Sequence, residues 1–485
     1  ASKLTWGKLR AWCSGGGAAP RDLAALGPDV WTADLPAERN GIKVLGVPIG
    51  TPEYVAACGC ERLTEETRLL EELAELPDTQ CAWILLALSA VPRANHLLRT
   101  VPPSMVKEYA RKHDDALWKA LNKFLRTEEK ATAPHAELSR QLATLPAKHG
   151  GLGLRSAERT STAAYWAGWV DALTVLKEKR PALAAQLLTS LEGPAPSQPR
   201  CLREATTARE TLLTHGADNL PTWRQAADGV AAPRPHDAEA GEWPHGWQYH
   251  ASSVLERSFR NSVVLPSATP RRQALIRSQS GHAAGKWLTT TPHDPALTLT
   301  PLRMQVALRL RLHYTLPLGP RHCNGRTCRA LLDAYGDHWS SCNRSGRLKL
   351  RATPLERTWA RVFREAGARV QTNVLLRDTN VQNVRADDQR RLEIVATGLP
   401  LHRGVPLGVD CTMTAPLHAD GSPWAHAATT DGVAIQRGEA SKNRTYPELL
   451  NNSRPKPPTL ACETGNRWSQ TGGQGVRPLA RAKAR

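Results

Sequence analysis

The chain has 485 residues, too many for one ordinary hydrophobic core, and 41% of them are hydrophobic, so we expect two to four folded domains. Lys and Arg number 64 and Asp and Glu 45, a net charge of +19 that favours a nucleic-acid partner over a role in solubility alone. The chain contains no run of 18 apolar residues, so no membrane span is predicted, and its ten cysteines are too sparse for a secreted disulfide scaffold and favour a reducing compartment.

The first half of the chain is predicted to be mainly helical. Residues 41–50 form a short apolar run with Gly at both ends, which indicates a buried strand and a turn. Helical spacing of apolar residues then recurs over residues 65–76, 82–89, about 104–125 and 160–176. Trp166 sits among Ala and Val at this spacing, which favours a core position over base stacking. Residues 191–200 and 231–245, rich in Pro, Ala and Gly, are predicted linkers.

Two predicted helices carry basic residues suited to a phosphate backbone, with a solvated helix face as the alternative. The candidate nucleic-acid contacts are Lys107, Arg111, Lys112, Lys119 and Lys123 in the helix at about 104–125, and Arg303, Arg309 and Arg311 in a shorter helix at about 302–312. Residues 471–485 contain basic residues and no acid, so we expect a disordered tail that attracts phosphate without reading sequence.

A cluster of metal-ligand residues follows the shorter helix. It consists of Cys323, Cys328, His338 and Cys342, spaced C-x4-C-x9-H-x3-C. Two close pairs across a loop suit a tetrahedral zinc ion, and three thiolates with one imidazole make a closed structural site. Free buried thiols are the alternative, and His313 and His322 remain open as substitutes for one ligand. Asp337 is the candidate acceptor that orients a ligand.

Two strand-like runs lie near the end of the chain, at residues 391–397 and 407–412. Alternation places Glu393 on the face opposite its apolar neighbours, and it places Asp410 on the same side as Thr412. If the two runs pair as neighbouring strands, both acids can converge on one Mg²⁺ ion. Two carboxylates holding a metal are the minimum for metal-assisted phosphodiester hydrolysis.

A cation for the phosphate is expected on a helix at about 435–446, where Lys442 precedes Tyr446 by four residues and shares its face. Another helix is predicted at about 354–367, opening with Pro in its first turn. Isolated acids and lysines are most often surface residues, which is the alternative here. Rival carboxylates are Asp387, Asp388 and Glu463.

The order of these parts resembles the C-terminal half of non-LTR retrotransposons of the restriction-like endonuclease type. The resemblance implies a nuclease that nicks target DNA for reverse transcription, with Glu393, Asp410 and Lys442 as catalytic residues and Tyr446 as their partner on the helix. It also implies structural Zn, catalytic Mg or Mn, DNA and element RNA as partners, and a nuclear location. Upstream, residues 8–12, 41–46 and 150–154 resemble the segments that lead from the polymerase active site into the thumb.

Two departures from the family pattern bear on activity. No Tyr/Phe-x-Asp-Asp motif occurs in the chain, so no polymerase active site is assigned to it. The first nuclease acid is Glu393 where the family has Asp, and Leu392 stands where the family has Pro. The extra methylene shifts the carboxylate and favours the alternative of a catalytically dead remnant that still binds DNA or RNA.

The predicted fold class is α+β, with a helical N-terminal half, a zinc knuckle, and a restriction-endonuclease-like mixed sheet flanked by helices. Five segments are expected. They are a polymerase palm end and thumb remnant at 1–180, a linker and helical connector at 181–300, a basic helix and zinc knuckle at 301–346, a restriction-like endonuclease at 347–470 and a basic disordered tail at 471–485. A zinc-stabilised interaction protein unrelated to nucleic acid is a third alternative.

Overall fold

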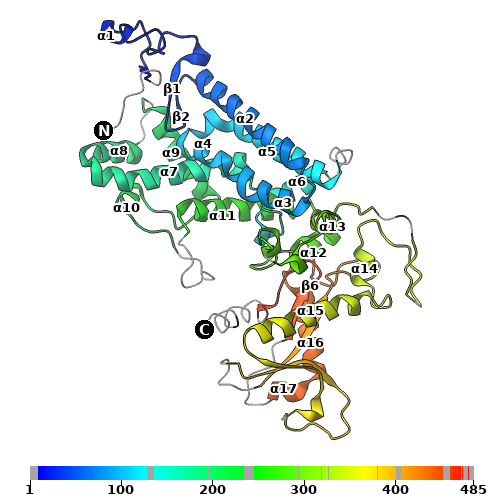
Figure 1. Ribbon diagram of the computed structural model, residues 1–485. Coiled ribbons are helices and arrows are strands. Elements are labelled where there is room, and N and C mark those ends of the chain that lie inside the picture. The colour runs from blue at the N-terminus through cyan, green and yellow to red at the C-terminus, as the bar shows by residue number, and fades with distance from the viewer. Residues whose placement is uncertain are drawn as a thin grey trace. The chain divides into compact units, whose positions relative to one another are not determined.

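A computed structural model of the chain combines helices with two small sheets, so the α+β class is confirmed (Figure 1). It describes residues 9–127, 136–193, 197–233, 245–292, 294–317, 319, 321–325, 327–379, 381–399, 406–451, 459–470, 472 and 479. The chain forms two compact units, which we call the helical unit (Ala1–Ala133 and Leu154–Val263) and the mixed unit (Pro134–Gly153 and Val264–Arg485). The finer five-segment division stays a prediction, and the predicted tail at 471–485 lies almost wholly outside the described residues.

The helical unit contains one β-hairpin and a set of packed helices. The hairpin pairs β1 (Gly41–Val44) with β2 (Val47–Gly50) in antiparallel register. The helices are α1 (Arg21–Ala24), α2 (Pro52–Ala74), α3 (Thr79–Leu85), α4 (Asn95–Thr100), α5 (Pro103–Leu125), α7 (Ala157–Lys179), α8 (Pro181–Glu192), α9 (Arg200–Thr214), α10 (Trp223–Ala227) and α11 (Trp247–Phe259). The predicted helix at 65–76 is therefore the second half of the longer α2.

The core of this unit is built around α7. Ser156 caps the start of the helix, where its side chain accepts a hydrogen bond from the backbone N–H of Arg159. Trp166 is fully buried and meets Trp247 of α11 edge-on, with ring centroids 5.9 Å apart. The predicted core position of Trp166 is confirmed.

One helical stretch in the described part of the chain, Thr79–Thr100, is long and apolar enough to cross a membrane by length and composition alone. It comprises α3, the π-turn η3 (Leu86–Ala90), the 3-10 turn η4 (Val91–Ala94) and α4. Trp83, Leu86 and Leu98 are at most 1% exposed within the helical unit. Leu85 and Leu88 of the same stretch are 39% and 54% exposed, and 39% of its apolar 18-residue window is buried.

The mixed unit places a four-stranded sheet among helices. Its helices are α6 (Ala136–Thr144), α12 (Pro270–Ser278), α13 (Pro301–Leu312), α14 (Asp337–Ser341), α15 (Arg347–Glu365), α16 (Val433–Thr445) and α17 (Pro447–Asn451). Its strands are β3 (Arg369–Leu375), β4 (Arg391–Thr397), β5 (Leu407–Thr414) and β6 (Thr459–Glu463). The strand order is β3-β4-β5-β6, with the first three antiparallel and β6 parallel to β5.

The core of the four-stranded sheet is formed where β4 and β5 pack against α15. Ile394 of β4 and Val409 of β5 are fully buried opposite each other and pack with Phe363 of α15. Helix α16 returns the chain from β5 to β6, as a parallel pair requires. The prediction that a helix begins at Pro354 is wrong. Helix α15 begins about two turns earlier, at Arg347, and contains that proline in its interior.

Candidate functional site

The two acids predicted to share a site lie on adjacent strands. Ile394 of β4 faces Val409 of β5, so the next pair along the antiparallel ladder brings Glu393 opposite Asp410. Glu393 Oε2 accepts a hydrogen bond of 2.7 Å from the backbone N–H of Cys411, which fixes its carboxyl beside Asp410. The expected pairing of the two runs as neighbouring strands is therefore confirmed.

Lys442 joins the two acids from α16. Its Nζ lies 2.8 Å from Oδ2 of Asp410. Asp410 is 5% exposed, and neither of its carboxylate oxygens accepts a hydrogen bond from any residue that the structure describes. The contact with Lys442 is therefore a charge pair without hydrogen-bond geometry. Buried carboxylate oxygens without donors are costly, and they are the oxygen ligands that divalent cations prefer.

The pKa of Glu393 is raised to about 7, first by burial and then by the repulsion of Asp410. The backbone N–H of Cys411 and the ammonium of Lys442 act in the opposite direction, and Glu356 of α15 raises the pKa further. Glu356 was not a sequence candidate. The site thus holds more negative than positive charge when its acids are ionised, an imbalance that a divalent cation would relieve.

Tyr446 anchors the end of α16 to the sheet. Its hydroxyl donates a hydrogen bond of 2.7 Å to the carbonyl oxygen of Arg391, the first residue of β4. Burial, followed by the charges of Asp410 and Glu393, raises the pKa of this phenol to about 12, so it stays neutral at physiological pH. Tyr446 therefore holds the end of α16 against β4, and its part in catalysis stays a prediction.

Gly438 sets how closely α16 approaches β5. A Cβ at this position would lie 2.7 Å from Cγ2 of Thr414 and 3.3 Å from Cγ2 of Thr412. Lys442 follows one helical turn later, so its reach to Asp410 depends on this close approach. Sequence reasoning missed Gly438, although an isolated glycine inside a predicted helix is the signal that marks such packing.

The rival acids form contacts of their own. Asp387 pairs with Arg385 at 3.0 Å, and Asp388 pairs with Arg390 at 2.6 Å. Glu463 is 2% exposed at the end of β6 and accepts a hydrogen bond of 3.4 Å from a backbone N–H in the first turn of α16. Asp388 therefore holds Arg390 next to the start of β4, Glu463 holds the start of α16 to β6, and Asp387 is a surface residue.

The predicted metal-ligand cluster is assembled in the mixed unit. The ligand atoms of Cys323, Cys328, His338 and Cys342 all lie within 4.8 Å of one another, and the group could hold a metal ion. The sulfur atoms of Cys323 and Cys342 are 3.9 Å apart, close to the separation of about 3.8 Å that a tetrahedral Zn–S bond of roughly 2.3 Å implies. The Cys328 sulfur is 3.4 Å from Nε2 of His338.

Hydrogen bonds to His338 and Cys342 favour the tautomer of the imidazole and the ionised thiolate that a metal ion requires. Nδ1 of His338 lies 2.7 Å from the carbonyl oxygen of Ala419, so Nδ1 carries the hydrogen and Nε2 offers its lone pair. Burial acts to raise the pKa of Cys342, but hydrogen bonds from the backbone N–H of Arg344 and from the Cys328 and Cys323 thiols outweigh it and lower the pKa to about 7. A lower pKa favours the thiolate that a metal requires.

The residues expected to support the cluster are arranged differently. Asp337, expected to orient a ligand, instead pairs with Arg271 at 2.6 Å and with Nε2 of His313 at 3.0 Å. Asp333 is the acceptor that shapes the loop, since it takes the N–H of His338 at 2.7 Å. His313 and His322 are outside the ligand group that the described residues form.

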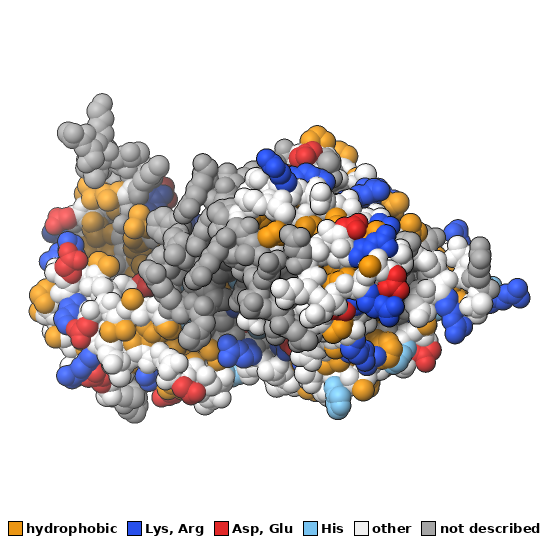
Figure 2. All heavy atoms as spheres, turned by 90° about the horizontal axis from the view of Figure 1, so that it is seen from below, with side chains coloured by type: hydrophobic (Ala, Val, Ile, Leu, Met, Phe, Trp, Pro, Cys, Tyr) orange, Lys and Arg blue, Asp and Glu red, His pale blue; other side chains and the backbone are white. Residues whose placement is uncertain are grey.

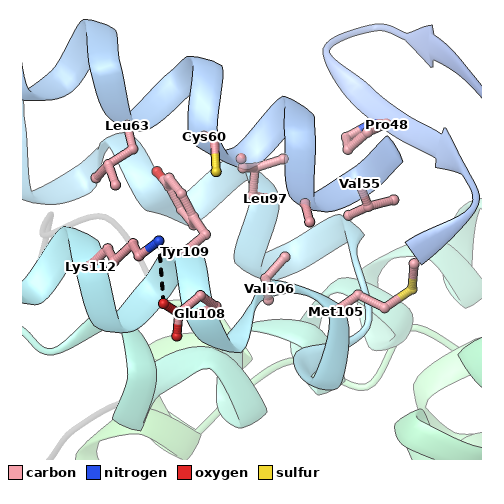
Figure 3. A pocket seen from close by; sticks show the side chains of 12 residues that line it. Pro48, Val55, Cys60, Leu63, Leu97, Met105, Val106, Glu108, Tyr109 and Lys112 are labelled. Atoms are coloured by element: carbon pink, nitrogen blue, oxygen red, sulfur yellow. Dashed lines mark ion pairs between the residues drawn. The ribbon is translucent and has the colours of Figure 1, made fainter. Parts of the chain in front are cut away.

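The predicted basic face of α5 is largely compensated by acids. Arg111 and Lys112 both pair with Glu108, at 2.8 and 3.3 Å, and Figure 3 shows the second pair at the edge of an apolar pocket. Lys123 pairs with Glu75 of α2. The two remaining lysines form no ion pair with a residue in the described ranges. They are Lys107 and Lys119.

The arginines predicted on α13 differ in exposure. Arg303 is exposed, but Arg309 and Arg311 are 8% and 4% exposed. Arg311 donates to the carbonyl oxygens of Gly151 and Ala147, both at 2.8 Å, so it fastens the loop at 147–151. Its burial and bonds are those of a structural residue and not of a phosphate contact.

Comparison of the whole chain with protein-family models and with curated proteins finds no match. The site is therefore defined by its geometry: two acids on adjacent strands, a lysine on α16, and a Cys3His group in the same unit.

Proposed function

We propose that the mixed unit is a divalent-metal-dependent endonuclease that nicks DNA, and that the chain derives from a non-LTR retrotransposon. The observation that carries the proposal is the convergence of Glu393, Asp410 and Lys442 from two adjacent strands and the following helix. A mixed sheet flanked by helices, preceded by a Cys/His cluster, is also the arrangement that the sequence resemblance implies. Element RNA as a second partner and a nuclear location follow from that resemblance alone.

Glu393 and Asp410 would hold Mg²⁺ or Mn²⁺. The fit is good, because both oxygens of Asp410 and Oε1 of Glu393 have no hydrogen-bond donor among the described residues. When bound, the ion lowers the pKa of the attacking water and neutralises charge on the phosphate. Glu393 must be ionised to take part, and Lys442 brings an ammonium beside the phosphate. Tyr446 and Gly438 hold α16 where Lys442 can do this.

Zinc is our proposal for the ion in the Cys3His group. Three cysteines and one histidine within 4.8 Å supply the soft ligands and tetrahedral count that structural zinc takes. Among the described residues the group has four members, the number that a closed site takes, so its contribution would be to stabilise the fold of the mixed unit.

Nicking of supercoiled plasmid by the full chain tests the endonuclease. We expect conversion to open circles in Mg²⁺ or Mn²⁺, none in EDTA, and a loss of at least roughly 100-fold in Asp410→Asn. The matched control is Asp387→Asn, because this acid is exposed and pairs with Arg385 on the same unit. Equal nicking by wild type and Asp410→Asn would overturn the proposal.

A catalytically dead DNA- or RNA-binding remnant is the second candidate. Glu393 favours it, since this residue replaces the family's shorter Asp and one of its oxygens is already bound to the N–H of Cys411. Salt-dependent DNA binding without nicking in either metal would support this candidate over the first.

A further inference from the structure

The net positive charge of the chain belongs to the mixed unit. The helical unit has 29 Lys and Arg and 29 Asp and Glu, whereas the mixed unit has 35 and 16, and 35 − 16 = +19 is the value of the whole chain. On the face shown in Figure 2, acidic and basic side chains are interspersed. Charge totals alone therefore do not locate a binding surface, and individual elements of the mixed unit must be compared.

Helix α15 has the strongest basic bias of these elements. It carries six Lys or Arg and two Glu over Arg347–Glu365. Trp359, Ala360 and Phe363 are at most 5% exposed and pack in the core of the sheet. One side of the helix is therefore fixed to the protein, and its charged residues must lie on the flanks and on the outer side.

Three arginines share one flank of α15. Arg357, Arg361 and Arg364 follow at i, i+4 and i+7, and all three are exposed. Arg361 pairs with Glu365 at 3.6 Å, a half-exposed contact that contributes little. Arg357 and Arg364 form no ion pair with any residue that the structure describes. This flank differs from α5, where most of the cations are already paired.

The same helix borders the candidate nuclease site. Glu356, next to Arg357 in the chain, acts electrostatically on both Glu393 and Cys411. Helix α15 also packs against β4 and β5, the strands that carry the two acids. Arg357 therefore lies at the same level of the helix as Glu356, about 100° around its axis, and the arginine flank runs from there along the helix for about 10 Å, at a rise of about 1.5 Å per residue.

We propose that the flank of α15 formed by Arg357, Arg361 and Arg364 binds the phosphate backbone of duplex DNA and leads it to the acids on β4 and β5. This rests on the proposed function. Guanidinium groups suit phosphate oxygens, and contacts to the backbone position a duplex without reading its sequence. The aromatic residues of α15 are buried, so the flank lacks the stacking platform that single strands require.

Salt-dependent DNA binding tests this surface. The double variant Arg357→Gln/Arg364→Gln of the full chain would be titrated with a labelled 30-base-pair duplex at several KCl concentrations, without added Mg²⁺ or Mn²⁺. We expect affinity to fall on the order of 10- to 50-fold near 0.1 M salt, and the slope of log K against log salt to become shallower by about 1.8, roughly 0.9 per lost phosphate contact.

The matched control is Arg21→Gln/Arg39→Gln, which removes the same charge from two exposed arginines of the helical unit that form no ion pair with a described residue. It should leave affinity and slope unchanged. Equal weakening by both double variants, or by neither, would overturn the proposal, as would an equal loss on single-stranded RNA of the same length. Binding is measured without cleavage, so the two proposals can fail separately. If the chain never nicks DNA but the double variant still makes the slope of log K against log salt shallower, the proposed endonuclease function is wrong and the DNA-binding surface is supported.

Discussion

Asp114 in the helical unit and Asp410 in the mixed unit are both buried aspartates, but their surroundings are opposite. Asp114 accepts hydrogen bonds from the Ser156 hydroxyl at 2.6 Å and from the N–H of Ala157 at 2.7 Å, at the start of α7. Asp410 accepts none from the described residues and lies beside another acid, with Lys442 as its ion-pair partner. A satisfied buried acid serves the fold, whereas an unsatisfied one beside a like charge indicates a binding function.

The two units also differ in how they use charge. The helical unit is neutral overall, and buried pairs such as Arg159–Glu256, at 2.8 Å, lie within its core. The mixed unit carries the whole excess of +19, and the exposed Arg357 and Arg364 of α15 form no ion pair with a residue that the structure describes. Charge counted over a compact unit thus indicates a polyanion surface more sharply than charge counted over the chain.

Removing the metal cluster should produce the largest difference between the units. In Cys342→Ser, we expect the mixed unit to lose on the order of 5 kcal/mol of stability, because a structural zinc ion contributes its binding free energy to folding. The helical unit should keep its own unfolding transition. Calorimetry would resolve the two transitions, and elemental mass spectrometry would give the zinc content.

The control for this experiment is Cys81→Ser, since Cys81 is an exposed free cysteine of the helical unit. It should change neither the zinc content nor either transition. If Cys342→Ser kept the zinc content and both transitions of wild type, or if wild type held no zinc, the Cys3His group would not be a structural zinc site.

Exchanging the two aspartates for asparagine should give opposite results. Asp114→Asn replaces one accepting oxygen with an N–H donor that faces the donors at the start of α7. We expect this change to lower the free energy of unfolding by roughly 2–3 kcal/mol and to leave nicking by the folded protein unchanged. Asp410→Asn removes both the repulsion with Glu393 and the ion pair with Lys442, two opposing changes, so it should cost less stability than Asp114→Asn while nicking is lost. Urea unfolding with a parallel nicking assay measures both, and equal destabilisation by the two variants would contradict the comparison.

The sequence predicted the parts of the site that depend on local spacing. Strand alternation around Glu393 and Asp410 predicted the bounds of β4 and the start of β5, and the pairing of these strands brought the acids together. The close spacing of the Cys/His residues in the chain likewise predicted that they would meet in space. In both cases the periodicity of a strand or the length of a loop limits where the side chains can lie.

The features that the sequence left unpredicted depend on tertiary packing. Strand β3 is an exposed edge of largely polar residues, so it lacks the alternation that marks a half-buried strand. Helical spacing grouped Arg311 with the exposed Arg303, but it could not tell that carbonyl oxygens of the 147–151 loop would take up the Arg311 guanidinium. Gly438 was overlooked because its role lies in the distance between α16 and β5.

The smallest expected difference between the units comes from substituting alanine for one helical glycine in each unit. In Gly438→Ala, the new methyl group meets Thr414 at 2.7 Å, and overpacking should cost about 1–2 kcal/mol after the better helix propensity of Ala is counted. Gly59→Ala in α2 meets Tyr109 at 3.4 Å, an ordinary contact, and should be neutral or slightly stabilising.

The decisive measurement is nicking by Gly438→Ala with and without Thr414→Ser, a change that removes the methyl group in the way. Displacing α16 moves Lys442 from Asp410, and nicking should fall about 10- to 100-fold, because an ångström of misplacement has effects of this size. Thr414→Ser should restore most of the nicking rate in the double variant, which a general loss of stability would not explain. If Gly438→Ala nicked like wild type, the position of Lys442 would not depend on this close approach, and the ammonium would reach its partner from a range of helix positions.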